Sequence, residues 1–130
     1  MTEPPRDNHI EHLVPYVADR VDLILHRLKK RKFDPVLFEG RRSVQRQRWL
    51  YGQGRSKWQC IKAGISPAYS HPGNVVSWTL KSYHITGKAC DLISKSRGWN
   101  HPAFFKALKE EAQAVGMKTI PQEDNHIEWS

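Results

Sequence analysis

The sequence predicts an α+β fold, a small single domain with a largely antiparallel sheet packed by about three helices. Two observations lead to this prediction. Helical patterns of apolar residues lie near both ends of the chain, and the short strand-like segments are mostly adjacent in sequence. The 130 residues suit one domain that buries a core without disulfides, and no repeat or linker divides them. We therefore expect residues 1–130 to form one domain.

Three segments have the pattern of helices. Apolar residues at three- and four-residue spacing predict a helix over residues 14–30. Ser43 is a typical N-cap for a second helix over residues 44–53. Asn100 is the expected cap of a third helix, which carries apolar residues on its inner face and ends at Gly116.

Strands are predicted where β-branched and other apolar residues form short runs. The predicted strands cover residues 36–38, 75–80, 89–93, 117–120 and 126–129. Residues 55–74 show no clear period and predict a long loop with at most a short turn of helix. Long loops of this kind are often functional.

Composition limits the classes of protein that fit. The net charge of +8 indicates a polyanionic partner, and charge alone leaves nucleic acid, an anionic membrane surface and a bacterial envelope as candidates. No apolar run reaches the roughly 18 residues of a membrane span, and residues 1–8 lack the pattern of an export signal. Cys60 and Cys90 are too few for a disulfide framework, so both are predicted to be reduced thiols.

Two histidines and one aspartate form a candidate catalytic zinc site. His84, Asp91 and His126 would leave the fourth tetrahedral position open for water, as catalytic sites do. His84 and Asp91 are seven residues apart, and a turn at Thr86 and Gly87 would let both side chains converge on one ion. The spacing permits convergence but does not require it.

Glu123 is the candidate catalytic base. It lies three residues before His126, in a loop that Pro121 opens, so it can lie beside a metal without binding it. A carboxylate there can take a proton from the attacking water and pass it to the leaving amine.

Two other interpretations compete with a zinc site. A chain with seven histidines offers chance combinations, and His9, Glu11 and His12 form a rival cluster that helix-entry residues explain better. A nucleic-acid-binding module would use the basic residues of 41–57, interleaved with aromatic residues, as a groove with stacking platforms. No recognised nucleic-acid signature accompanies them, and most of the arginines would lie on the solvated face of the second helix.

Three separated blocks resemble the D-alanyl-D-alanine carboxypeptidase (VanY-like) peptidase family. The blocks are Ser82-x-His84-x-x-Gly87-x-Ala89-x-Asp91, Glu123-x-x-His126 with Ile127-Glu128-Trp129, and the upstream stretches 39–47 and 50–55. Residues 76–87 most resemble phage endolysins of the L-alanyl-D-glutamate endopeptidase type. Ordered agreement over residues 38–129 is far more specific than any single motif.

The resemblance implies a hedgehog/DD-peptidase-like fold, one Zn²⁺ per chain and hydrolysis of the peptidoglycan stem peptide at the L-alanyl-D-glutamate bond. It implies that His84, Asp91 and His126 are ligands, that Glu123 is the base, and that Arg42 faces the substrate and stabilises the oxyanion. Ser82 and Gln47 are weaker candidates for substrate contacts or for contacts that support the ligands. A carboxypeptidase that trims terminal D-alanine and a zinc site kept for stability are alternatives.

The same resemblance sets expectations for partners and location. The partners would be the peptidoglycan stem peptide and an anionic envelope surface, with no nucleic acid and a monomeric enzyme. The protein would be made in the bacterial host cytoplasm without a signal peptide and would act in the periplasm after release. Arg41 stands where relatives have an aromatic residue, residues 116–123 lack an aromatic-rich insert, and no wall-binding domain is expected after Trp129.

Overall fold

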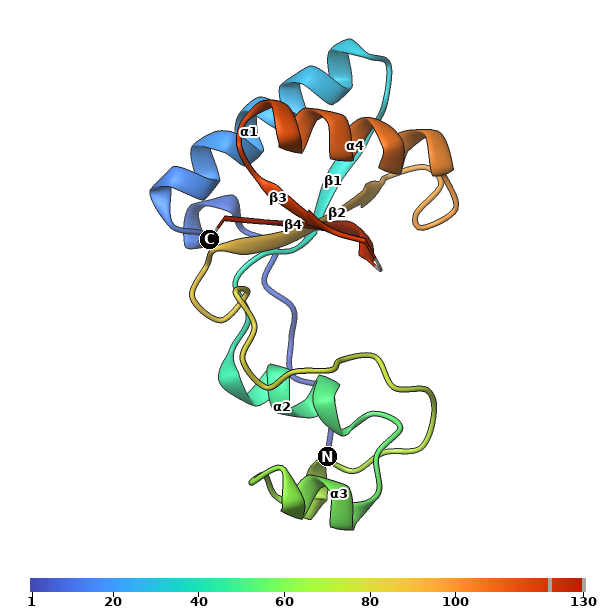
Figure 1. Ribbon diagram of the computed structural model, residues 1–130. Helices are drawn as coiled ribbons and strands as arrows, with labels where there is room; N and C mark the ends of the chain where they lie inside the picture. Colours follow the sequence, from blue (N-terminus) through green and yellow to red (C-terminus); the bar gives the residue numbers. More distant parts are fainter. Residues whose placement is uncertain (122, 130) are drawn as a thin grey trace.

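The computed structural model describes residues 1–121 and 123–129 and has two lobes (Figure 1). The sheet lobe holds a four-stranded sheet with two helices, and the helical lobe, residues 41–81, holds two shorter helices. The helices are α1 Pro15–Lys30, α2 Val44–Gly52, α3 Lys57–Lys62 and α4 Pro102–Ala114, and the strands are β1 Pro35–Glu39, β2 Ala89–Ser94, β3 Lys118–Ile120 and β4 Glu123–Glu128. Short 3₁₀ helices cover Ile10–His12 and Pro67–Tyr69. The predicted α+β class is confirmed.

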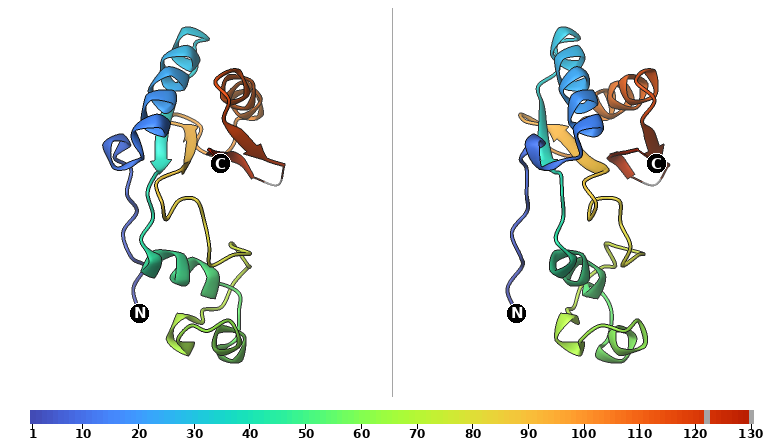
Figure 2. Two further views of the ribbon diagram at one scale, coloured as in Figure 1. Left: turned by 60° about the vertical axis from the view of Figure 1, so that its left-hand side comes forward. Right: turned by 90° about the vertical axis from the view of Figure 1, so that its left-hand side faces the viewer.

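All pairings in the sheet are antiparallel, in the order β1-β2-β4-β3. The central strands β2 and β4 pair so that Asp91 lies directly opposite His126. Helices α1 and α4 cover one face of the sheet and contact each other (Figures 1 and 2). The helical lobe and the start of the chain extend away from this layer.

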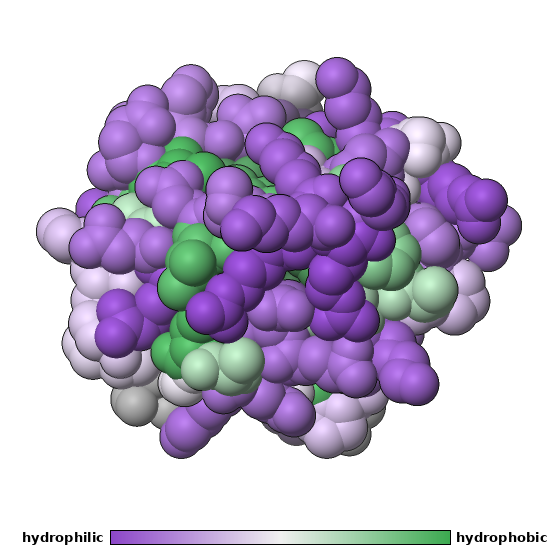
Figure 3. All heavy atoms as spheres, turned by 90° about the horizontal axis from the view of Figure 1, so that it is seen from above, coloured by the Kyte–Doolittle hydropathy of each residue, from purple (hydrophilic) through white to green (hydrophobic). Residues whose placement is uncertain are grey.

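The main core lies between the sheet and its two helices. The predicted helical spacing in α1 is confirmed, because its buried side chains come from Val17, Val21, Ile24 and Leu28. They pack with apolar residues of β2, β4 and α4. Seen from above this layer, the outer surface is mostly hydrophilic, with smaller apolar patches between polar side chains (Figure 3). No helix among the described residues has the length and apolar content needed to cross a bilayer.

The helical lobe has a small core of its own. Cys60, Ile65 and Tyr69 are buried there against Trp49, Tyr51 and Leu80. Ser43 caps α2 as predicted, since its hydroxyl accepts a hydrogen bond from the backbone of Arg46. Ser56 and Gln59 form a reciprocal capping box at α3.

Four predicted features are wrong. Residues 55–74, predicted as a long loop with at most a short turn of helix, contain α3 and the 3₁₀ helix Pro67–Tyr69. Residues 75–80 form no strand, although their composition favours one. Val76 and Trp78, which would share one face of that strand, are 57% and 83% exposed, so no buried face holds the segment in a sheet. Helix α4 begins one residue later than predicted, with His101 rather than Asn100 as its N-cap. Glu123 begins β4 instead of lying in a loop.

Candidate metal centre

Three side chains from separate parts of the chain, His84, Asp91 and His126, converge on one face of the sheet. Asp91 on β2 and His126 on β4 are cross-strand partners, so they lie side by side on one face. His84 comes from the connection between the two lobes. His84 Nε2 lies 3.2 Å from His126 Nδ1 and 3.4 Å from Asp91 Oδ1, and the last two atoms are 3.3 Å apart. The structure thus brings together the three ligands predicted from the sequence.

A tight turn over residues 82–87 brings His84 to this position. The backbone N–H groups of Ile85 and Gly87 donate to the carbonyls of Ser82 and His84. Gly87 has φ of +75°, and a Cβ there would lie 3.2 Å from the backbone nitrogen of Val14. Only glycine combines this conformation with so close an approach. The turn predicted at Thr86 and Gly87 is therefore present.

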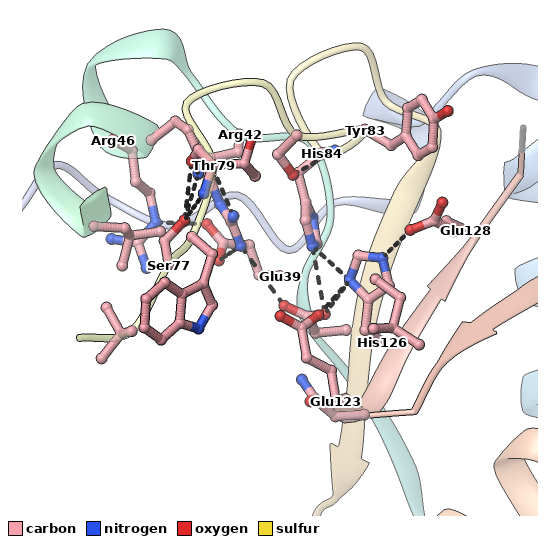
Figure 4. A pocket seen from close by; sticks show the side chains of 18 of the residues that line it. Glu39, Arg42, Arg46, Ser77, Thr79, Tyr83, His84, Glu123, His126 and Glu128 are labelled. Atoms are coloured by element: carbon pink, nitrogen blue, oxygen red, sulfur yellow. Dashed lines mark hydrogen bonds and ion pairs between the residues drawn. The ribbon is translucent and has the colours of Figure 1, made fainter. Parts of the chain in front are cut away.

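The outer nitrogens of both imidazoles face hydrogen-bond acceptors. His84 Nδ1 lies 2.7 Å from the carbonyl oxygen of Gly40, and His126 Nε2 lies 2.8 Å from Oε1 of Glu128. A carbonyl or an ionised carboxylate only accepts, so these nitrogens carry the ring protons. In the neutral rings the inner nitrogens, which face each other (Figure 4), are then lone-pair donors for a metal ion.

This donor set fits a tetrahedral zinc ion. With ligand distances of about 2.0–2.1 Å, the corners of the tetrahedron lie about 3.3–3.4 Å apart, which is the separation of the three inner atoms. The site also attracts positive charge. Burial alone would raise the pKa of Asp91, but the adjacent imidazoles of His126 and His84 hydrogen-bond to it when they are protonated, and this holds the pKa well below its usual range. Burial would lower the pKa of His126, but Asp91 and Glu128 raise it.

Glu123 lies beside the three ligands without belonging to them. Its Oε2 is 3.4 Å from His126 Nδ1, and half of its side chain is exposed. Side chains three apart on a regular strand would point to opposite faces, but the register of β4 with β3 shifts between Glu123 and Ile127, and the Glu123 carboxylate lies near His126 (Figure 4). It can therefore reach both the centre and a bound water or substrate.

Arg42 connects the centre to the helical lobe. Its Nη2 donates to Glu39 at 2.7 Å and lies 3.7 Å from Asp91 Oδ2, the oxygen that faces away from the histidines. Its Nη1 donates to the amide oxygen of Gln47. These contacts orient Asp91, and the predicted role in oxyanion stabilisation stays a prediction.

Gln47 is buried and bonded at every polar atom. Its Nε2 donates to the hydroxyl of Ser77 and to the carbonyl of Thr79, while its Oε1 accepts from Arg42. Gln47 therefore fixes the 77–79 segment as a wall, and direct contact with substrate stays a prediction. The Ser82 hydroxyl accepts from the backbone of His84 and also borders the cavity, so its substrate contact stays a prediction too.

A cavity of about 900 Å³ opens above the three ligands. Its walls come from both lobes. Gln47, Ser77 and Trp78 line one side, and Trp99 and Glu123 of the sheet lobe line the other. A cavity of this size can hold a short peptide segment.

Sequence reasoning gave no role to Glu39 or Glu128. Glu128 lies two residues after His126, and side chains two apart on a strand share a face, so this spacing could have revealed it. Glu39 is buried and bonded to Arg42 and Arg46. Burial would raise the pKa of Glu39, but these two arginines lower it. Its role depends on the pairing of β1 with β2, which local sequence does not encode.

The rival cluster near the N-terminus is arranged differently. Asp7, not Glu11, joins His9 and His12. The two Nδ1 atoms lie 3.1 Å and 2.6 Å from different oxygens of the Asp7 carboxylate. Hydrogen bonds from protonated nitrogens explain these contacts, so this cluster needs no metal.

No family model and no curated protein matches this sequence. Solved structures do match its fold. Serratia marcescens L-Ala D-Glu endopeptidase ChiX aligns with a TM-score of 0.59 and 19% identity, over 98% of this chain and 92% of that one. VanYB in complex with D-alanine-D-alanine aligns with a TM-score of 0.64 and 13% identity, over 90% of this chain and 71% of that one. A variant of the D,D-pentapeptidase VanY in complex with Zn(II) aligns with a TM-score of 0.60 and 12% identity, over 90% of this chain and 72% of that one. The chain therefore has the VanY-like zinc peptidase fold.

Proposed function

We propose that this protein is a zinc-dependent peptidase that hydrolyses the stem peptide of bacterial peptidoglycan. The triangle of donor atoms carries the proposal, because two neutral imidazoles and one carboxylate leave a fourth position open beside Glu123. Solved structures with this fold include the L-Ala D-Glu endopeptidase ChiX and VanYB in complex with D-alanine-D-alanine.

His84, Asp91 and His126 would hold the ion, and Glu128 and the carbonyl of Gly40 would keep the two rings in the required tautomers. When bound, zinc supplies Lewis-acid chemistry, which polarises the scissile carbonyl and lowers the pKa of the attacking water.

The protein's own residues move the proton. Oε2 of Glu123 accepts the proton of the water as the water attacks the carbonyl carbon, and then delivers it to the leaving nitrogen. Arg42 holds the outer oxygen of Asp91 and borders the cavity where negative charge develops. The cavity walls, tied together by Gln47, orient the peptide and limit the access of bulk water.

We propose the L-alanyl-D-glutamate bond as the bond cleaved. The support is the mutual coverage with the endopeptidase ChiX, 98% of this chain and 92% of that one, whereas VanYB has further parts that this chain does not cover. We further propose that the protein acts as a lytic enzyme of phage type, monomeric, made in the cytoplasm of the host and active on the periplasmic wall.

Digestion of purified peptidoglycan tests the proposal. Zinc-loaded protein is incubated with the wall polymer, and the fragments are identified by mass spectrometry after labelling of new amino groups. The matched control is Glu123→Gln, which preserves size and the three ligands. New N-terminal D-glutamate that disappears with chelator and in the control supports the endopeptidase.

Other products give clear answers. Free D-alanine without new D-glutamate termini would assign the chain to carboxypeptidases and contradict the proposed bond. No fragments from zinc-loaded protein with one ion per chain would contradict the peptidase proposal as a whole.

A further inference from the structure

The positive charge of the protein is concentrated in the helical lobe. Residues 41–81 hold eight of the 21 lysines and arginines and none of the 13 aspartates and glutamates. The remaining residues therefore carry thirteen cationic and thirteen anionic side chains. The formal charge of +8 therefore equals that of residues 41–81, and the rest of the chain is neutral in sum.

Much of this charge faces solvent. Arg42 and Arg46 pair with Glu39, and Arg55 donates to backbone carbonyls and lies over Tyr51. The other five cationic side chains are exposed and have no ion pair among the described residues; they are Arg41, Arg48, Lys57, Lys62 and Lys81. At the end of α1, Arg31 pairs with Glu110 and Glu111 of α4, whereas Lys29, Lys30 and Lys32 are exposed.

Helix α3 adds apolar groups to this charged surface. Trp58 is 65% exposed and Ile61 is 49% exposed, and both lie on the outer side of the helix, opposite the buried Cys60. Side chains three and four apart on a helix are neighbours, so Lys57, Trp58, Ile61 and Lys62 form one continuous face. The capping box and Cys60 hold the helix against the lobe. Helix α3 itself lies at the end of the molecule farthest from the sheet (Figures 1 and 2).

We propose that this α3 face, formed by Lys57, Trp58, Ile61 and Lys62, binds the surface of an anionic phospholipid bilayer. Lysines interact with the lipid phosphates, and the indole and the aliphatic side chain enter the boundary between headgroups and acyl chains, where tryptophan is favoured. Exposed Ile61 favours lipid over nucleic acid, because an aliphatic side chain gains little from phosphates or bases but much from hydrocarbon.

Charge complementarity sets the expected size of the effect. Each lysine near an anionic membrane contributes an attraction equivalent to about fivefold in affinity. Removing Lys57 and Lys62 together should weaken binding by about 30-fold at low salt, and the effect should shrink as salt rises.

Co-sedimentation with vesicles tests the proposal. The full protein is mixed with vesicles of phosphatidylglycerol and phosphatidylethanolamine, and separately with neutral phosphatidylcholine. The variant pair is Lys57→Gln/Lys62→Gln against Lys29→Gln/Lys30→Gln, which removes the same charge from exposed positions of the sheet lobe. A third variant, Trp58→Gln/Ile61→Gln, removes the apolar groups. Thermal unfolding curves verify that each variant is folded.

We expect the protein to bind anionic vesicles only. Both α3 variants should lose this binding, and the sheet-lobe variant should keep most of it. Equal losses in the two lysine variants would show that net charge alone acts, and this would overturn the proposal. So would unchanged binding of Trp58→Gln/Ile61→Gln, or tighter α3-dependent binding to a single-stranded oligonucleotide than to vesicles. Because vesicle binding requires no catalysis, these outcomes are independent of the proposed peptidase activity.

Discussion

Replacement of Glu128 by alanine should weaken zinc binding without touching a ligand. In the folded protein the Glu128 carboxylate lies 2.8 Å from Nε2 of His126, and the two side chains are 14% and 6% exposed. The interaction keeps the proton on Nε2 and so keeps Nδ1 free for the metal. Without it the ring can rotate and can take the other tautomer.

The size of the loss follows from the burial of this hydrogen bond. Hydrogen bonds to charged groups contribute about 1.5–3 kcal/mol, and about 1.4 kcal/mol corresponds to a factor of ten in affinity. Glu128→Ala should therefore bind zinc about 10- to 100-fold more weakly, the usual range for outer partners of a metal ligand. Glu128→Gln keeps an oxygen acceptor but no charge, and it should fall between alanine and the native protein.

Competition with a chromophoric zinc chelator at constant pH measures these affinities. The matched control is Glu110→Ala, which removes the same charge from an exposed position paired with Arg31. If Glu128→Ala and Glu110→Ala bind zinc within twofold of each other, the hydrogen bond does not orient His126 and the reasoning fails.

Three further predictions concern the base, the ligands and the buried ion pairs. Glu123→Gln should lower kcat by about 10²- to 10⁴-fold while one zinc ion stays bound. Turnover assays measure the first quantity and elemental analysis the second. Full activity of this variant would show that Glu123 is not the base. Chelation should lower the Tm of the native protein, because removal of a bound ion removes its stabilising contribution. It should leave the Tm of His84→Ala unchanged, because this variant lacks a ligand and holds no ion to remove. The folded pKa of Glu39 lies below its usual 4.5, so its stabilisation is complete above that pH and is lost as the pH falls through the folded value. Denaturant unfolding should therefore show Glu39→Gln destabilised by about 3 kcal/mol at pH 7 and clearly less at pH 3, and an equal deficit at both would contradict the ion-pair account.

Local sequence predicted those elements in which the buried residues recur at the spacing of the element itself. Val17, Val21, Ile24 and Leu28 are buried at helical spacing in α1, so the pattern and the structure agree. The segment 75–80 has the composition of a strand, but its exposed face meets no partner. Side chains take the place of a neighbouring strand there, since Gln47 donates to the carbonyl of Thr79 and Arg55 to that of Ser77. Composition alone does not encode those partners.

The candidate site was predictable as a set of residues but not as a geometry. The family-like spacing identified His84, Asp91 and His126, whereas their distances depend on two long-range features. One is the register that places Asp91 opposite His126, and the other is the contact of Gly87 with the backbone before α1. Both join segments far apart in sequence, and a pattern within one segment does not specify them.

Arg42 makes the metal centre and the far wall of the cavity parts of one chain of polar contacts, which begins with an ion pair and continues with hydrogen bonds. The chain runs from the outer oxygen of Asp91 through the guanidinium to Gln47, and from there to the 77–79 segment. Since this segment forms no strand, it is held by side chains, Gln47 of α2 and Arg55, and not by the sheet. A displacement of α2 would therefore change the width of the cavity and the orientation of Asp91 together. The helical lobe thus contributes to the positioning of a metal ligand as well as to one wall of the cavity.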